Sequence, residues 1–276
     1  MKQSFRQVII IIAMLTFFSL VAKPIYAEIN IPDVLKRCVL AIGVKDYNYN
    51  ESTGEESVNI IFRGTGFLVW DDRYILVTAR HVVFDNDGKV FPNLCFWGSK
   101  INGEPFLRSV SEIQKKYEKI EWIAAPYPDS HVDIAASVVE LNISEENLGF
   151  VTRNGFAKMK DIDIGNDIYY LGYPDDIGTK HDSKPVIKSN PVLRGGMVAH
   201  KEKDYFYIDA VVAPGNSGGP VFKFDKKTDS INLIGIVSAF KPFVKEGMPF
   251  HSGLGIVFSA DSIRELLDSI PFKKTM

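Results

Sequence analysis

Short apolar segments rich in Val, Ile, Phe and Tyr, separated by turn-forming residues, recur along most of this chain and limit the folds open to it. They lie at 39–44, 59–70, 74–78, 94–97, 120–125, 134–141, 168–172, 192–199, 205–212, 220–224, 233–238 and 254–258. Frequent short strands are typical of antiparallel sandwiches and barrels, and not of alternating strand–helix units. The polar stretch 46–57 is predicted to be a loop, and 71–73 a hairpin turn. We therefore predict an all-β fold.

One helix is predicted, at the end of the chain. Four apolar residues fall at i, i+3, i+4 and i+7, which is the spacing of a helix with one buried face. They are Ile263, Leu266, Leu267 and Ile270. Ser259 or Asp261 can cap the first turn, and Pro271 ends the helix. We expect its apolar stripe to pack against the second half of the chain.

The N-terminal segment differs from the rest. Lys2 and Arg6 precede an almost unbroken apolar stretch, 8–22, and Ala27 offers a small residue at a cleavage point. This order is typical of a secretory signal peptide. The alternative is a transmembrane anchor, but the stretch is shorter than the ~18–20 apolar residues that a span needs. We expect residues 1–27 to be a signal peptide and the mature protein to be exported, to a periplasm or outside the cell.

Length and composition are those of a folded protein: 276 residues, 46% hydrophobic and 24% charged, with a formal net charge of −2. No sustained basic run is visible, so nucleic acid is not an expected partner, and neither is a membrane once the signal peptide is removed. The polar, turn-prone segment 154–166 predicts a boundary. It gives an N-terminal domain over 28–155 and a C-terminal domain over 156–276. Oligomeric state stays open.

The two cysteines, Cys38 and Cys95, leave two interpretations open. In an exported protein they can form a disulfide within the first half of the chain. Alternatively, each is a small buried side chain on a strand, as free cysteine often is. Their spacing does not decide between the two, because a disulfide needs a specific Cα separation.

The sequence GNSGGP at 215–220 carries the clearest chemistry. Gly215 lets the backbone turn so that two N–H groups point at one spot beside the hydroxyl of Ser217. The amides of Gly215 and Ser217 would then stabilise the negative oxygen that forms when a carbonyl is attacked. Gly218 and Gly219 keep the approach open for a substrate backbone. The alternative is a Gly-rich hairpin turn without chemistry.

A serine hydroxyl is a weak nucleophile until a base takes its proton, so the hypothesis requires a histidine. His81 follows a predicted buried strand that would deliver it to a rim; the alternative is a packed core histidine. The remaining histidines are interpreted as solvated side chains of loops and strand ends. They are His131, His181, His200 and His251.

A third group must orient the imidazole and stabilise its charged form. Asp133 directly precedes an apolar strand, where a carboxylate can be held half-buried against a neighbouring loop. Asp129 is the nearby alternative, but it follows a Tyr-Pro turn and is expected to be solvated. The candidate triad is therefore His81, Asp133 and Ser217.

Four motifs in this order resemble the successive signatures of trypsin-like serine peptidases of the chymotrypsin superfamily. They are GTGFLV at 64–69, LVTARHVV at 76–83, DIA at 133–135 and GNSGGP at 215–220. Further segments, LGYP at 171–174, GMV at 196–198, LIGIVS at 233–238 and LGIVF at 254–258, are most similar to the bacterial HtrA/Do-like branch. The likeness covers roughly 39–270. The order His, Asp, Ser is that of chymotrypsin.

The resemblance implies two six-stranded antiparallel β-barrels with an active site in the cleft between them. His81 and Asp133 would come from the first barrel, and Ser217 with the oxyanion amides from the second. Ser238 and its neighbours would pair with an extended substrate backbone as an added strand.

Three departures from the family pattern limit what the resemblance implies. Val82 follows His81 where digestive relatives have a cysteine, and Asn216 precedes Ser217 where they have an aspartate that serves activation by N-terminal cleavage. HtrA-type proteins also carry PDZ domains after the peptidase domain, whereas this chain ends about a helix past the last predicted strand. We expect a peptidase domain without PDZ domains, and we carry over neither activation by cleavage nor trimer assembly.

By the same resemblance, two segments would line the pocket for the substrate side chain before the cut bond. They are Val211, Val212, Ala213 and Pro214, and Ser238, Ala239 and Phe240. The first segment offers no carboxylate for a Lys or Arg side chain, and the second lacks the histidine that glutamate-cutting relatives place on this strand. Phe240 stands where digestive relatives have glycine and would narrow the pocket. We predict cleavage after small or medium aliphatic residues.

The function predicted from the sequence is that of a serine endopeptidase acting on polypeptides through an acyl-enzyme, without a cofactor or metal. Two alternatives use the same cleft. One is a catalytically silent module that binds an extended peptide, and the other is an esterase with the same triad. Silent members of such families usually lose a triad residue, whereas all three are present here.

Overall fold

A computed structural model describes residues 32–50, 52, 54–100, 102–109, 122–125, 131–139, 148–174, 190–225 and 228–270. The chain divides into two units, 1–32 and 33–276, and every element below belongs to the second. The predicted signal peptide, 1–27, lies outside the described residues. Within the described residues, no helix has both the length and the apolar character needed to cross a membrane.

The first half of the second unit folds into an antiparallel sheet of eight described strands, in the order β5-β4-β1-β2-β3-β7-β6, with β8 added parallel to the end of β2. The strands are β1 (Val39–Asn50), β2 (Glu55–Trp70), β3 (Tyr74–Thr78), β4 (Leu94–Ser99), β5 (Pro105–Ser109), β6 (Trp122–Ala124), β7 (Ala135–Val138) and β8 (Val151–Thr152). The predicted number of six strands is therefore exceeded in this half, because the short β6 and β8 extend the sheet.

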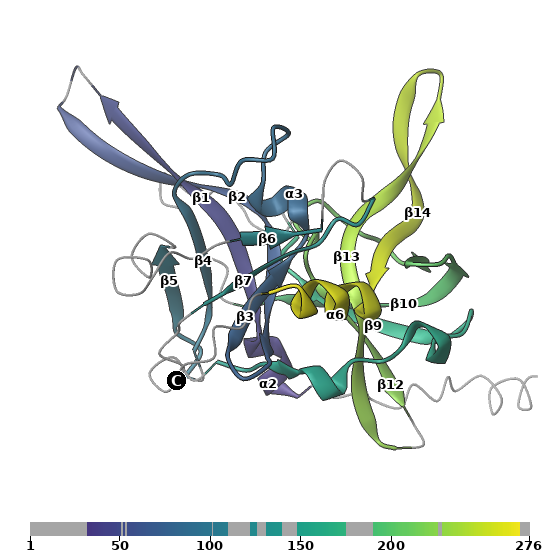
Figure 1. Cartoon of the computed structure of the whole chain (residues 1–276). Helices are drawn as coiled ribbons and strands as arrows, with labels where there is room; N and C mark the ends of the chain where they lie inside the picture. Colours follow the sequence, from purple (N-terminus) through teal and green to yellow (C-terminus); the bar gives the residue numbers. More distant parts are fainter. Residues whose placement is uncertain are drawn as a thin grey trace, which may run out of the picture. The chain divides into compact units, whose positions relative to one another are not determined.

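The second half forms a closed six-stranded barrel in the order β10-β11-β14-β13-β12-β9. Its strands are β9 (Asp167–Gly172), β10 (Val192–Lys201), β11 (Tyr205–Asp209), β12 (Pro220–Asp225), β13 (Ser230–Lys245) and β14 (Met248–Ser259). The all-β fold class is confirmed, and so is the barrel of the second half (Figure 1).

The helices are short. They are α2 (Asp33–Arg37), α3 (Arg80–Val83), α6 (Ala260–Asp268) and the 3₁₀ turns η1 (Arg153–Gly155) and η2 (Met159–Asp161). The side chain of Ser259 caps α6 by accepting the N–H of Ser262. Its predicted apolar face is buried against strands of both halves, since α6 contacts β13, β14 and β7. The helix prediction is confirmed.

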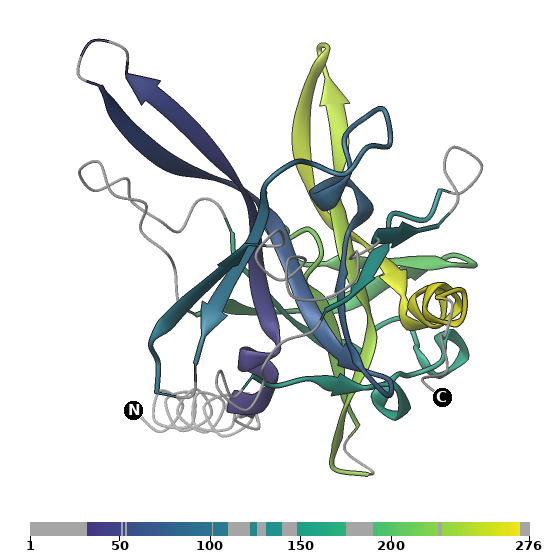
Figure 2. The same cartoon turned by 60° about the vertical axis from the view of Figure 1, so that its left-hand side comes forward.

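The predicted loop over 46–57 is wrong. β1 and β2 continue through this stretch as a two-stranded hairpin in which Tyr47 pairs with Val58 and Tyr49 with Glu56. Tyr47 and Tyr49 alternate with polar residues, as on a strand, but both are exposed and the ribbon has no buried face. The many polar residues and Gly54 favoured a loop instead. A second long hairpin joins β13 to β14. Both extend past the other strands in the same general direction (Figure 1, Figure 2).

The β13–β14 hairpin is closed by a two-residue turn. Lys245 pairs with Met248, and the intervening Glu246 and Gly247 have φ values of 54° and 78°. Positive φ at both central residues defines a type I′ turn, whose twist matches that of the flanking strands. The strand β13 therefore runs well beyond the segment 233–238 that the sequence predicts.

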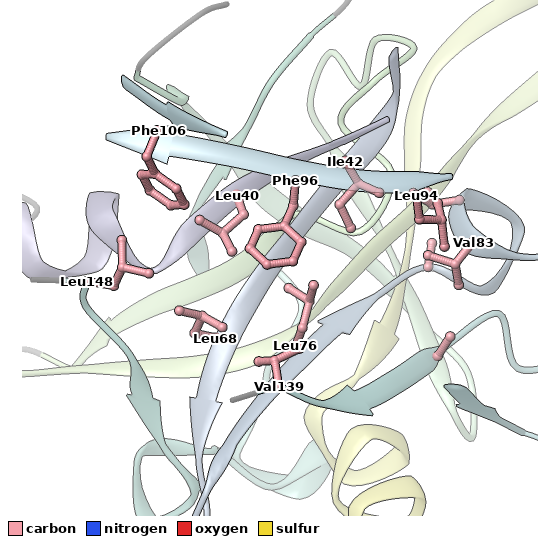
Figure 3. Close-up of a cluster of buried hydrophobic side chains, with 13 residues drawn as sticks. Leu40, Ile42, Leu68, Leu76, Val83, Leu94, Phe96, Phe106, Val139 and Leu148 are labelled. Atoms are coloured by element: carbon pink, nitrogen blue, oxygen red, sulfur yellow. The ribbon is translucent and has the colours of Figure 1, made fainter. Parts of the chain in front are cut away.

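Each half has its own hydrophobic core. In the first, Leu40, Leu68, Leu76 and Phe96 meet between β1, β2, β3 and β4 (Figure 3). In the second, Tyr170, Phe206 and Val257 lie inside the barrel with nine further buried residues. Both cysteines are buried and are not joined in a disulfide, so the disulfide interpretation is wrong and the interpretation as small buried side chains is confirmed. Burial raises the pKa of the Cys38 thiol.

Candidate active site

The end of β3 and the start of β7 lie side by side, because Thr78 pairs with Ala135. His81 lies in α3, directly after β3, and Asp133 lies just before β7. Nδ1 of His81 is 2.7 Å from Oδ2 of Asp133, and the His81 backbone N–H donates to Oδ1 at 3.0 Å. An ionised carboxylate only accepts hydrogen bonds, so Nδ1 carries the proton and Nε2 is left as the basic nitrogen.

The same carboxylate receives a hydrogen bond from the second half of the molecule. Oγ of Ser238, in β13, donates to Oδ2 of Asp133 at 2.6 Å. Ser238 lies at a register shift between Val237 and Ala239, and a bulge of this kind re-aims a side chain. The Asp133 side chain is only 22% exposed and is held from both halves. Its carboxylate is therefore fixed against the imidazole.

The turn that carries Ser217 is built around two glycines with positive φ. Gly215 and Gly218 both have φ of 89°, a region that side chains rarely adopt. The N–H of Asn216 donates to the Ala213 carbonyl at 3.1 Å, and the N–H of Gly219 donates to the Asn216 carbonyl at 2.9 Å. Within the described residues, the N–H groups of Gly215 and Ser217 donate no hydrogen bond. These two amides are therefore available to a ligand oxygen.

Gly218 brings this turn against the first half of the molecule. A Cβ atom at Gly218 would lie 1.8 Å from the Thr65 carbonyl oxygen and 2.4 Å from Oγ1 of Thr78. The N–H of Gly218 donates to the Val237 carbonyl at 2.7 Å. The backbone here fits between β2, β3 and β13 only because the residue has no side chain.

Thr65, in β2, joins the serine turn to the first sheet. Its N–H donates to the Ser217 carbonyl at 2.8 Å, and its Oγ1 donates to the Gly215 carbonyl at 2.7 Å. The same Oγ1 accepts the N–H of Tyr173 at 3.0 Å, and the Thr65 carbonyl accepts Oγ1 of Thr78 at 2.6 Å. Thr65 lies within the GTGFLV motif at 64–69, but the motif alone does not indicate this bridging role.

The Ser217 backbone and the residue that follows His81 both pack against the open face of one glycine, Gly64. A Cβ atom at Gly64 would lie 2.8 Å from the Ser217 carbonyl oxygen and 2.6 Å from a methyl of Val82, the residue after His81. Among the described residues, no hydrogen bond joins Oγ of Ser217 to Nε2 of His81. Such contacts are often long in unliganded enzymes and tighten when substrate binds.

The two segments assigned to the specificity pocket differ in what they present. Val211 is 61% exposed, whereas the side chain of Val212 is buried in the barrel core. Ala239 and Phe240 are half-buried. The ring of Phe240 is stacked on the imidazole of His251, with centroids 4.8 Å apart.

The remaining candidates from the sequence lie elsewhere. His131 faces Asp204 at 3.5 Å, and His200 faces Glu202 at 3.1 Å. His181 and Asp129 lie outside the described residues. Of the side chains considered for proton transfer, the structure brings together His81 and Asp133. Ser238, which donates to Asp133, directly follows Val237, whose carbonyl accepts the N–H of Gly218 in the serine turn.

A buried serine turn, an imidazole–carboxylate pair and a second hydroxyl on the carboxylate, held across two β-sheets, define the class of chymotrypsin-like domains. The family model described as "Trypsin-like peptidase domain" matches residues 64–236. The chain belongs to this family.

Two curated relatives carry the name "Probable periplasmic serine endoprotease DegP-like". The protein from Chlamydia muridarum (strain MoPn / Nigg) is 29% identical over 192 residues, which is 69% of this chain and 31% of that protein. The one from Chlamydia trachomatis (serovar D) is 26% identical over 210 residues, 75% of this chain and 33% of that protein. The chain thus spans about a third of the length of these relatives.

A solved structure titled "Structure of Glu endopeptidase in complex with MPD" has a similar fold. It matches with a TM-score of 0.54 and 14% sequence identity, over 84% of this chain and 89% of that one. At this identity the likeness concerns the fold alone.

Proposed function

We propose that this protein is a serine endopeptidase that cleaves polypeptides through a triad of Ser217, His81 and Asp133. The observation that carries the proposal is the carboxylate of Asp133, which accepts hydrogen bonds from Nδ1 of His81 at 2.7 Å and from Ser238 at 2.6 Å. This arrangement leaves Nε2 of His81 free to accept a proton next to a serine turn with two unpaired amides.

In the proposed acylation step, Oγ of Ser217 attacks the substrate carbonyl carbon while its proton passes to Nε2 of His81. The carbonyl oxygen becomes negative and accepts the N–H groups of Gly215 and Ser217. The tetrahedral intermediate collapses, the C–N bond breaks, and the leaving amine takes the proton from His81. The products of this step are an acyl-enzyme ester on Ser217 and a free amine.

Deacylation repeats the sequence with water as the nucleophile. Nε2 of His81 takes a proton from water as its oxygen attacks the ester carbonyl. The second intermediate then releases the carboxylic acid, and the proton returns from His81 to Oγ of Ser217. Throughout, Asp133 holds the imidazole and stabilises its charged form without taking the proton.

For specificity we propose cleavage after small or medium aliphatic residues. The exposed Val211 and the half-buried Ala239 offer no charge to a substrate side chain, and the Phe240 ring limits the space. A profile of cleavage after each residue type tests this proposal, and a strong preference for Arg, Lys or Glu would overturn it.

A binding module that holds a peptide without cutting it is the second candidate function. It is favoured by one observation, the lack of a hydrogen bond between Ser217 and His81. Labelling with a fluorophosphonate, which reacts only with an activated serine, separates the two functions. We expect labelling of the folded protein and none of a Ser217→Ala variant; an unlabelled native protein that still binds peptide supports the binding module. Amide and ester substrates tested side by side distinguish an endopeptidase from an esterase.

We also propose export, with residues 1–27 as a removed signal peptide and domains over 28–155 and 156–276. The basic start, the apolar stretch 8–22 and the periplasmic relatives support export. N-terminal sequencing of the exported protein tests the proposal, and a mature protein that still begins at residue 1 would contradict it.

A further inference from the structure

We propose that His251 sets the width of the substrate pocket through its hydrogen bond to Val212, which makes it a specificity-determining residue. The inference rests on the proposed function, since it takes the segments 211–214 and 238–240 as the two walls of the pocket. From the sequence, His251 is expected to be a solvated residue of a turn. In the structure, its imidazole instead contacts Val212 on one side and Phe240 on the other.

A local irregularity of β14 places His251 at this position. Phe240 pairs with Gly255 but Pro242 pairs with His251, so β14 carries additional residues opposite Lys241. Gly253, in this irregular stretch, has φ of 86°. Its carbonyl accepts the N–H of Ala210 at 3.3 Å, which brings the stretch against the start of the 211–214 wall.

Both ring nitrogens of His251 are used. Nδ1 accepts the N–H of Gly253 at 2.9 Å, so this nitrogen carries no proton. Nε2 lies 2.8 Å from the Val212 carbonyl oxygen and therefore carries the proton and donates it. The two contacts fix one tautomer and one orientation of the imidazole.

The imidazole also packs against the other wall. Its ring and that of Phe240 are stacked, with centroids 4.8 Å apart and an interplanar angle of 17°. His251 thus joins β13 to the 211–214 segment, by stacking on one side and by a hydrogen bond on the other. The imidazole therefore ties the 211–214 segment to β13, and its size and orientation contribute to the separation of the two walls.

The adjacent carbonyl of the same wall is held independently. The carbonyl of Val211 accepts a hydrogen bond from the hydroxyl of Tyr170, in β9. It also accepts one from the guanidinium of Arg194, in β10, at 3.5 Å. Loss of His251 would therefore leave the wall attached to the barrel but release it from β13. The expected result is a wider pocket in a folded protein.

The test compares three variants of His251 with a matched control in the full chain. His251→Ala removes both contacts, His251→Phe keeps a ring for stacking without a donor, and His251→Gln keeps a donor near the position of Nε2. His200→Ala is the control, because His200 is an exposed histidine that faces Glu202. Fluorophosphonate titration counts active protein, and kcat and KM are measured on amide substrates that differ only in Val or Phe before the cut bond.

We expect the native protein and the His200 control to prefer Val. In His251→Ala and His251→Phe the ratio of kcat/KM for Val over Phe should fall at least about tenfold, the scale on which pockets discriminate side-chain size. The change should come from a higher KM for Val and a lower KM for Phe, and His251→Gln should stay within about threefold of the native ratio. A purely structural role would lower kcat for both substrates and leave the ratio unchanged, which would overturn the proposal. The proposal would also be overturned if His251→Phe, which lacks the hydrogen-bond donor, kept the native ratio of kcat/KM for Val over Phe.

A second measurement separates this inference from the proposed function. In a Ser217→Ala background, binding of product peptides that end in Val or Phe reports the pocket without turnover. If the native protein fails to label but His251→Ala still reverses the preference between these peptides, the peptidase proposal fails and the role of His251 stands. If the native protein is active, but His251→Ala changes neither the kcat/KM ratio for Val over Phe nor the relative binding of the two product peptides, the role of His251 is refuted and the peptidase proposal stands.

Discussion

Replacing Thr65 with valine tests whether the first sheet positions the turn of the proposed catalytic serine. The two side chains have nearly the same shape, so the change replaces the hydroxyl with a methyl group and alters little else. In the native protein this hydroxyl donates to the Gly215 carbonyl at 2.7 Å and accepts the N–H of Tyr173 at 3.0 Å. Thr65 is fully buried, so water cannot replace either partner.

The contacts of the Thr65 hydroxyl allow the loss of stability and the loss of activity to be estimated. A buried polar group left without its partner costs about 1–3 kcal/mol, so two such groups predict a free energy of unfolding lower by about 2–6 kcal/mol. The Gly215 peptide also helps to define the direction of the proposed oxyanion donors. Displacing one donor lowers kcat by about 10²–10³-fold, and we expect a loss of this order with little change in KM.

Thr65→Ser is the matched control, because it keeps the hydroxyl and loses a methyl group. Urea unfolding and steady-state kinetics on one peptide amide measure the two effects, with active protein counted by fluorophosphonate titration. We expect Thr65→Ser to retain most activity. A Thr65→Val variant within about threefold of native kcat, or a Thr65→Ser variant as impaired as Thr65→Val, would refute the reasoning.

Three further predictions follow from the same geometry. Asp133→Asn should reverse the tautomer of His81, because the amide donates where the carboxylate accepted, and kcat should fall about 10⁴-fold without loss of folding as judged by circular dichroism. Gly218→Ala should unfold at markedly lower urea concentration, since its Cβ would lie 1.8 Å from the Thr65 carbonyl oxygen at φ of 89°. Burial raises the pKa of Tyr170 to about 12 from an ordinary 10.0, so the folded state holds this proton more tightly and the free energy of unfolding should fall as pH rises through that interval. Unfolding of Tyr170→Phe measured between these pH values should show a smaller slope, and an unchanged slope would contradict the assignment.

Much of the fold was predictable because its strands have a buried face. Segments such as 74–78 and 205–212 combine β-branched or aromatic residues with adjacent turn residues, and the sequence predicts a strand in each; the structure has strands at Tyr74–Thr78 and Tyr205–Asp209. The two long hairpins were not predicted at full length. Each of their outer parts has only one neighbouring strand and little core to cover, so apolar side chains there, such as Tyr49 and Val244, are exposed and do not mark a buried strand face.

Some residues of the candidate site can also be recognised from the sequence, whereas others can be recognised only from the structure. The glycines around Ser217 are visible in the sequence because they serve a backbone conformation that only local residues determine. The residues that hold this turn are not visible, because their partners are remote: Thr65 and Gly215 are 150 residues apart, and Ser238 and Asp133 are 105 apart. A threonine or serine at these positions looks like any other polar residue of a strand until the pairing of the sheets is known.

His251 is a residue whose sequence context predicts the wrong environment. Its neighbours Ser252 and Gly253 indicate a turn, and a histidine in a turn is ordinarily solvated. The extra residues of β14 instead fold the Gly253 N–H back onto Nδ1, which directs Nε2 at Val212, 39 residues earlier in the chain. The feature that made His251 look unremarkable in the sequence, a glycine two residues away, is therefore what fixes its tautomer. Pocket width in this protein depends on a bulge, and a bulge is a property of strand register rather than of residue type.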